Sequence, residues 1–261
     1  MKHTLLCMNK FDFVTRISHN HDVVFQIMDF YGEKAILKGV DYRLIADADI
    51  TDLNRVEGPL KIELPRLNIA SNIIPGKVLH IDGDKSYVEK AKEIYHKYKV
   101  PAKCLYIDEE AMPVMIKSLL LKEKYDVLVI TGHDFLKNDK QQSSDVLTRY
   151  ENSINFVGAV QQARLLYSDL DSLIIIAGAC QSNYEALMAS GANIASSPSR
   201  SNIHLLDPLI AAVIIATTSI KEYVLPEDIV NKTISKALGG VESKGKARVH
   251  YAGDTLNGNI N

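Results

Sequence analysis

Residues 125–134 read YDVLVITGHD, and residues 172–181 read SLIIIAGACQ. Each stretch is a nearly unbroken apolar run followed by glycine and then by a reactive side chain, His133 in the first and Cys180 in the second. A strand without apolar–polar alternation is typical of a parallel sheet covered by helices on both faces. In such a sheet ligands bind beyond the carboxyl ends of the strands. If the two strands are neighbours, roughly 4.8 Å apart, the two side chains can approach each other there.

The chain around these two stretches alternates strands and helices. The clearest helix is expected over residues 85–98, where Val88, Ala91 and Tyr95 recur at spacings of three and four. Further strands are expected at 77–81, 101–107 and 193–196, and further helices at 109–122, 149–167, 183–190, 208–216 and 227–237, the last capped by Gly239-Gly240. This order predicts a three-layer α/β sandwich with a mostly parallel sheet over residues 76–243.

The rest of the chain divides into three parts. Residues 1–56 are expected to form a small β domain with short strands at 23–28, 35–37 and 42–46, separated by tight turns, and an SH3-like barrel fits that pattern. Residues 57–75 contain two prolines and mixed charges and are expected to be a linker. The polar residues 244–261 are expected to be a flexible tail.

The composition limits the classes of function. The 261 residues carry a formal net charge of −2, which gives no footprint for nucleic acid. Three scattered cysteines are too few for a disulfide framework or a zinc site, and they fit a reducing compartment. We find no signal peptide and no apolar run long enough for a membrane span. The expectation is a cytoplasmic protein without membrane or nucleic-acid partners.

The pairing of Cys180 with His133 predicts a nucleophile and its base. A thiolate is the nucleophilic form of cysteine, and an imidazole or a following helix raises its population. The backbone N–H groups of Cys180, Gly132 and Asp134 are the expected oxyanion donors. This chemistry requires neither a metal nor an organic cofactor. The 47 positions between the two residues match the caspase-type order, in which the histidine lies about 50 residues before an Ala-Cys pair.

Four blocks carry a closer resemblance: PGKVLHIDGD (75–84), DVLVITGHD (126–134), AGACQS (177–182) and GANIASSPSRSNIHLLDP (191–208). They are similar to the YabG family of sporulation peptidases, and the similarity runs from about Asp22 to Gly240. The resemblance implies a caspase-like cysteine endopeptidase in which Cys180 is the nucleophile and His133 the base. It also implies action in the mother cell and on the forming spore coat, with coat and cortex-associated proteins as substrates cut after arginine.

The candidates for arginine binding lie around the loop 195–204. In caspase-like folds this loop helps to wall the pocket for the residue before the cleaved bond, and Ser196, Ser197 and Ser199 belong to it here. A buried arginine side chain needs an acidic partner with fork geometry, and Asp207 and Asp134 are the two candidates. Asp134 also stands where many caspase-like peptidases carry glycine, which leaves the oxyanion donors open.

Several other residues have competing interpretations. Asp82-Gly83-Asp84 could bind Ca²⁺ or Mg²⁺, although a turn with a helix cap is more common for such a triplet. His204 follows a short strand, which favours a structural or binding role over that of the base. Cys7 and Cys104 are interpreted as structural. The basic residues from Lys244 to Arg248 could be a site of autoprocessing.

Two other functions compete with the peptidase. One is a non-catalytic spore-coat scaffold in which the α/β domain is inert. The other is a flavodoxin-like phosphate or nucleotide domain that uses the turn at residues 82–84.

Overall fold

The computed structural model describes residues 8–58, 63–137 and 146–250. Its larger sheet has the strand order β13-β11-β10-β9-β7-β8. The five parallel strands are β7 (Val78–Asp82), β8 (Ala102–Tyr106), β9 (Val127–Thr131), β10 (Ile174–Ala177) and β11 (Ile194–Ser196). Strand β13 (Leu238–Gly240) closes the edge antiparallel to β11. The expected mostly parallel sheet is therefore confirmed, and β9 and β10 are neighbours in it.

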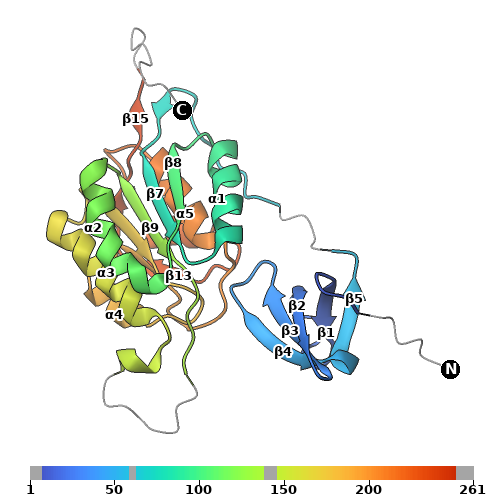
Figure 1. The fold of residues 1–261 in the computed structure, drawn as a ribbon. Coiled ribbons are helices and arrows are strands. Elements are labelled where there is room, and N and C mark those ends of the chain that lie inside the picture. Colours follow the sequence, from blue (N-terminus) through green and yellow to red (C-terminus); the bar gives the residue numbers. More distant parts are fainter. Residues whose placement is uncertain (1–7, 59–62, 138–145, 251–261) are drawn as a thin grey trace.

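Helices cover both faces of this sheet (Figure 1). On one face lie α1 (Lys85–Lys97) and α5 (Asp207–Thr217), and on the other lie α2 (Met112–Lys122), α3 (Ser153–Leu166) and α4 (Tyr184–Ala189). All the residues of β7, β9 and β10 are buried. Burial on both faces explains why these strands carry no polar alternation.

The N-terminal residues form a separate antiparallel sheet of five strands in the order β4-β3-β2-β1-β5. Its strands are β1 (Phe13–Arg16), β2 (Phe25–Tyr31), β3 (Lys34–Gly39), β4 (Ile45–Asp49) and β5 (Leu53–Val56). A small core containing Phe25, Ile27 and Leu37 fills one face. The β-rich domain is thus present, with two more strands than the sequence indicates. Residues 42–44, which we expected to begin a strand, instead belong to the β3–β4 loop.

The chain after α5 differs from the expected helix over 227–237. Only α6 (Pro226–Val230) is helical there, and Gly239 and Gly240 belong to β13 rather than to a helix cap. A Cβ atom at Gly240 would lie 2.3 Å from the carbonyl oxygen of Asn193. The glycine therefore allows the close backbone approach of an edge strand, a use that local sequence does not distinguish from a cap.

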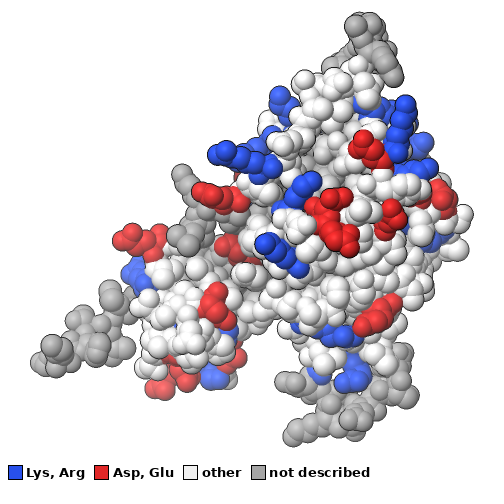
Figure 2. All heavy atoms as spheres, turned by 180° about the vertical axis from the view of Figure 1, so that it is seen from behind, with Lys and Arg blue, Asp and Glu red and all other residues white. Residues whose placement is uncertain are grey.

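The expected flexible tail from Lys244 is partly ordered. Strand β14 (Ser243–Lys244) pairs with β12 (Tyr223–Val224), and β15 (Arg248–Val249) pairs with β6 (Ile73–Ile74). The residues from 251 onward lie outside the described part of the chain. On the face shown in Figure 2, basic and acidic side chains are interspersed.

Candidate active site

Strand order and register place His133 and Cys180 at the same edge of the sheet. In the parallel ladder Ile130 is the partner of Ala177. His133 lies three residues beyond Ile130, and Cys180 lies three residues beyond Ala177. Both residues therefore follow neighbouring strands at the same edge of the sheet.

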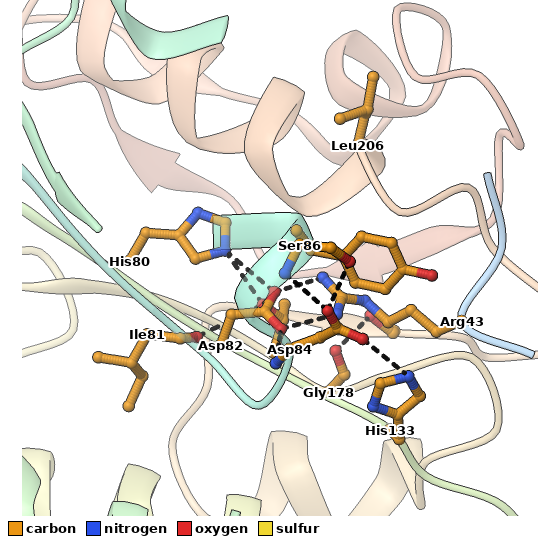
Figure 3. A network of polar contacts seen from close by, with 12 residues as sticks. Arg43, His80, Ile81, Asp82, Asp84, Ser86, His133, Gly178 and Leu206 are labelled. Carbon is orange, nitrogen blue, oxygen red and sulfur yellow. Dashed lines mark hydrogen bonds and ion pairs between the residues drawn. The ribbon is translucent and has the colours of Figure 1, made fainter. Parts of the chain in front are cut away.

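The same register adds a third residue, Asp84. Thr131 is the partner of Asp82, so Asp84 stands opposite His133, two residues beyond the pair. The Nε2 atom of His133 lies 3.7 Å from a carboxylate oxygen of Asp84 (Figure 3). Asp84 also caps α1, because its side chain accepts a hydrogen bond from the backbone N–H of Ser86 at 2.8 Å. The turn-and-cap interpretation of this triplet is thus correct for Asp84.

A second carboxylate, that of Glu109, lies on the other side of the imidazole. Its Oε1 atom accepts a hydrogen bond from the His133 backbone N–H at 2.9 Å and lies 3.8 Å from Nδ1. Burial alone would raise the pKa of Glu109, but the contacts with His133 hold it below its ordinary value. Both ring nitrogens therefore face acidic groups, which favours a fixed imidazole orientation.

Gly132 makes room for Glu109. A Cβ atom at Gly132 would lie 2.5 Å from Glu109 Oε1, so any other residue would displace this carboxylate. The turn is held further by Asn152, whose side-chain amide donates to the His133 carbonyl oxygen at 2.9 Å. The Tyr87 ring stacks on the imidazole, with 6.2 Å between the ring centroids. Backbone and ring are thus both constrained around His133.

Cys180 is enclosed in the structure, with only 1% of its surface exposed. Its thiol donates a hydrogen bond to the carbonyl oxygen of Ile203 at 3.5 Å. No hydrogen bond joins the thiol to His133, although both residues are described. Helix α4 begins four residues after Cys180 and is capped by Asn183, whose side chain accepts from the N–H of Ala186. The structure thus brings the pair to one edge of the sheet without a hydrogen bond between them.

The two predicted arginine-binding acids are buried and already accept hydrogen bonds from nearby loops. Asp134 accepts from the N–H groups of Phe135 and Asn152 and from the hydroxyl of Ser153. Asp207 accepts from the N–H groups of Ile234 and Ser235 at 2.7 and 3.1 Å. Burial raises the pKa of both carboxyls. In this arrangement each acid organises a loop, and neither presents a free carboxylate to a ligand.

The remaining candidates of the loop 195–204 divide by burial. Ser196 and Ser197 are fully buried, whereas Ser199 is exposed and its hydroxyl lies 3.0 Å from that of Ser201. His204 is buried, which lowers its pKa to about 4, and its Nδ1 accepts from the N–H of Leu206. A neutral, hydrogen-bonded His204 fits the structural role that we expected for it.

An ion pair between Arg43 and Asp82 lies beside this site and was missed by the sequence analysis (Figure 3). Arg43, from the β3–β4 loop, donates from Nη1 and Nη2 to the two carboxylate oxygens of Asp82 at 2.8 and 2.5 Å. Their side chains are 2% and 1% exposed. Asp82 also accepts from the hydroxyl of Thr131 at 2.8 Å. The only signal in the sequence was the position of Asp82 at the end of a buried strand, because its partner comes from another domain.

This ion pair makes stability depend on acid pH. Burial alone would raise the pKa of Asp82, but the Arg43 guanidinium holds it well below the ordinary value of 3.8. A lowered pKa in the folded state contributes stability above about pH 5, which is lost as the pH falls through that pKa. The double variant Asp82→Asn, Arg43→Met lacks this contribution. Between pH 7 and pH 2, the free energy of unfolding measured with urea should fall by at least about 1.4 kcal/mol more in wild type than in the double variant. Equal losses would contradict the assigned linkage.

The other candidate cysteines and a possible metal site were compared with the described residues. Burial raises the pKa of Cys104 to about 12, in agreement with a structural thiol, while Cys7 lies outside the described residues. In the described ranges no group of three or more His, Cys, Asp or Glu side chains is placed to hold a metal ion. Within the same ranges, none of the helices has the length and apolarity needed to cross a membrane.

Comparison with known proteins identifies relatives over nearly the whole chain. The sequence family described as YabG peptidase U57 matches residues 9–66 and 66–252. A protein of Bacillus subtilis (strain 168) named "Sporulation-specific protease YabG" is 37% identical over 278 aligned residues, which cover 91% of this chain and 96% of the relative. No solved structure gives a significant match. The matched range includes both the β domain and the α/β domain with His133 and Cys180.

Proposed function

Because the chain belongs to the YabG peptidase U57 family, we propose that it is a cysteine endopeptidase in which Cys180 and His133 form the catalytic dyad. The observation that carries the proposal is that Asp84, His133 and Cys180 follow the carboxyl ends of the neighbouring strands β7, β9 and β10. A parallel sheet of this kind binds ligands at that edge. A nucleophile, a base and an acid that orients the base are the parts that covalent catalysis requires.

The proposed reaction has two steps. His133 takes the proton of the Cys180 thiol, and the thiolate attacks the peptide carbonyl carbon, so that a carbon–sulfur bond forms while the oxygen becomes an oxyanion. The backbone N–H groups of Cys180 and Asp134 donate to no described acceptor and are free to stabilise that charge. The carbon–nitrogen bond then breaks, and His133 protonates the leaving amine. A water molecule finally hydrolyses the thioester, which releases the acid product and returns the thiol.

The proposed substrates follow from the name of the relative and from the resemblance described above. We propose that the enzyme acts during sporulation in the mother cell and on the forming spore coat. Its substrates would be spore-coat and cortex-associated proteins, cut after arginine. Autoprocessing remains a prediction, but Lys244 and Arg248 lie in β14 and β15, so they are not part of a free basic tail.

The two competing functions have less support. A phosphate or nucleotide domain at residues 82–84 would place anions beside Asp82, which binds Arg43, and Asp84, which caps α1. An inert scaffold would have no need for two carboxylates flanking His133.

Labelling with a thiol-directed inhibitor that carries a peptidyl-arginine group tests the dyad. We expect one adduct per chain on Cys180 after incubation to completion, as found by peptide mapping with mass spectrometry, because of the two described thiols only that of Cys180 lies beside a candidate base. The Cys104→Ala variant should be labelled like wild type, and Cys180→Ala should not be labelled. An otherwise identical inhibitor with glutamate in place of arginine should react at least about tenfold more slowly. Labelling that persists in Cys180→Ala would show that another residue is the nucleophile.

A further inference from the structure

The β3–β4 loop, residues 40–44, contacts the proposed active site. Tyr42 and His204 form an isolated antiparallel bridge, and the Asp41 carbonyl oxygen accepts from the Leu205 N–H at 2.9 Å. Backbone pairing with the edge of a domain is one way for a protein to hold a peptide. The β domain thus contributes to the edge of the α/β domain a tight turn around Arg43, in which the Leu44 N–H donates to the Tyr42 carbonyl oxygen at 2.8 Å.

This pairing takes place next to the nucleophile. The carbonyl oxygen of Ile203 accepts the hydrogen bond of the Cys180 thiol, and the next residue, His204, pairs with Tyr42. One segment of the α/β domain therefore contacts both the thiol and the loop. Together with the near-complete burial of Cys180, this contact indicates that the site is closed in the structure.

Side chains of α1 hold the backbone of the loop from the other side. The Tyr87 hydroxyl lies 3.1 Å from the Gly39 carbonyl oxygen and 3.3 Å from that of Tyr42. The Lys90 ammonium group donates to the carbonyl oxygen of Val40 at 3.0 Å. These contacts are made to the backbone of the loop. They therefore position the loop without depending on the identity of its side chains.

Arg43 is the loop residue whose side chain makes specific contacts in the site. Its guanidinium carbon lies 4.6 Å from the centre of the Tyr87 ring, which stacks on His133. The planar fork of the guanidinium matches both oxygens of Asp82, a geometry that selects arginine over lysine. Burial would lower the pKa of Arg43, but Asp82, Tyr87 and Cys180 keep it above its ordinary value. An arginine is therefore fully charged and bidentately bound one ring away from the proposed base.

A purely structural role explains these contacts less well. A buried ion pair is a weak source of stability, because the desolvation of two charges offsets most of their attraction. An apolar contact between the domains would hold them at least as firmly. A carboxylate beside the dyad that binds a guanidinium is instead what cleavage after arginine requires.

We propose that residues 41–44 occupy the position of a substrate, with Arg43 in the arginine subsite and Asp82 as the acid of that subsite. The β domain then acts as an intramolecular inhibitor, and the enzyme becomes active when this segment leaves. The inference rests on the proposed function. It assigns the acid of the arginine subsite to Asp82, whose carboxylate already binds a guanidinium, in place of Asp134 and Asp207.

Two changes to the same ion pair should affect activity in opposite directions. In Arg43→Ala the subsite is vacant, so kcat/KM for a peptidyl-arginine substrate should rise at least about tenfold. Adding Asp82→Asn to this variant should lower kcat/KM at least about tenfold, because the substrate guanidinium loses its partner. Arg55→Ala, which breaks the Arg55–Asp12 ion pair within the β domain, should leave kcat/KM unchanged. The proposal fails if Arg43→Ala gives no rise, or if the double variant is as active as Arg43→Ala.

A binding measurement separates the subsite from the catalysis. In the Cys180→Ala background, isothermal calorimetry should show acetyl-arginine methylamide binding at least about tenfold more tightly when Arg43→Ala is also present. The lysine analogue should not show this gain. Equal binding with and without Arg43→Ala would overturn the subsite proposal and would not contradict the proposed peptidase function. A gain of binding in this background, together with no cleavage of protein by the Arg43→Ala variant that retains Cys180, would instead overturn the proposed function alone.

The Arg43→Lys variant is a control for the case in which Arg43→Ala does not fold. It retains the positive charge and loses the fork, so it should give a smaller rise in kcat/KM than Arg43→Ala. Thermal unfolding of each variant shows whether it is folded. If Arg43→Ala does not fold, a folded Arg43→Lys variant with wild-type activity overturns the proposal.

Discussion

The Cys180→Ala variant is expected to lose at least about 10⁴-fold in kcat/KM toward a protein cut after arginine, because the proposed thioester forms on the Cys180 sulfur. The loss should lie in kcat, since an alanine leaves the arginine subsite unchanged. Mass spectrometry of new protein termini measures it over long incubations. Cys104→Ala, which removes a buried thiol at β8, is the matched control and should retain activity.

The integrity of the fold is checked on the same samples. Cys180 is 1% exposed, and alanine removes a single sulfur atom, so the thermal midpoint should change by only a few degrees. Cleavage in Cys180→Ala at more than about a hundredth of the wild-type rate would contradict the nucleophile assignment. A control preparation of Cys180→Ala with His133→Ala identifies any contaminating peptidase.

The central part of the fold could be predicted because the relevant signals are local. Strands β9 and β10 are apolar on both faces, and each ends in a glycine and a reactive residue. In a parallel sheet the offset between two strands is constant, so the spacing of His133 and Cys180 along the chain becomes proximity in space. The only missing fact was that the strands are neighbours, which the structure supplies.

The surroundings of the site could not be predicted because their contacts come from distant segments. Glu109 belongs to a short turn before α2, yet it receives the N–H of His133. Arg43 belongs to another domain and lies in a loop that resembles a continuation of a strand. Asp134 and Asp207 were chosen for their nearness in sequence, but local backbone groups already satisfy both of them. Sequence patterns describe which face a residue occupies, and they do not describe which polar partner reaches it.

The predicted ends of helices and strands were wrong for a related reason. The pair Gly239-Gly240 is compatible with a helix cap and with an edge strand. The choice depends on the Asn193 carbonyl oxygen, which approaches Gly240 from β11. Such a tertiary contact overrides local propensity.

The second large effect is expected for His133→Ala, which should lower kcat by about 10²- to 10⁴-fold with little change in KM. Loss of the imidazole removes both the base and the acid that protonates the leaving amine, and it leaves the arginine subsite intact. His96→Ala, an exposed histidine in the last turn of α1, should have no effect. His204→Ala tests the rival base and should keep the capacity for catalysis.

Chemical rescue distinguishes a base from a residue that only supports the fold. His133→Ala leaves a space between Tyr87, Asp84 and Glu109 that has the size and the acidic surroundings for imidazole. Added imidazole should therefore restore part of the activity in a concentration-dependent manner, and it should not do so in Cys180→Ala. A structural role would give a variant with a lowered thermal midpoint and no rescue. Rescue of His204→Ala in place of His133→Ala would move the base to the loop 195–204, and the register argument for the dyad would fail.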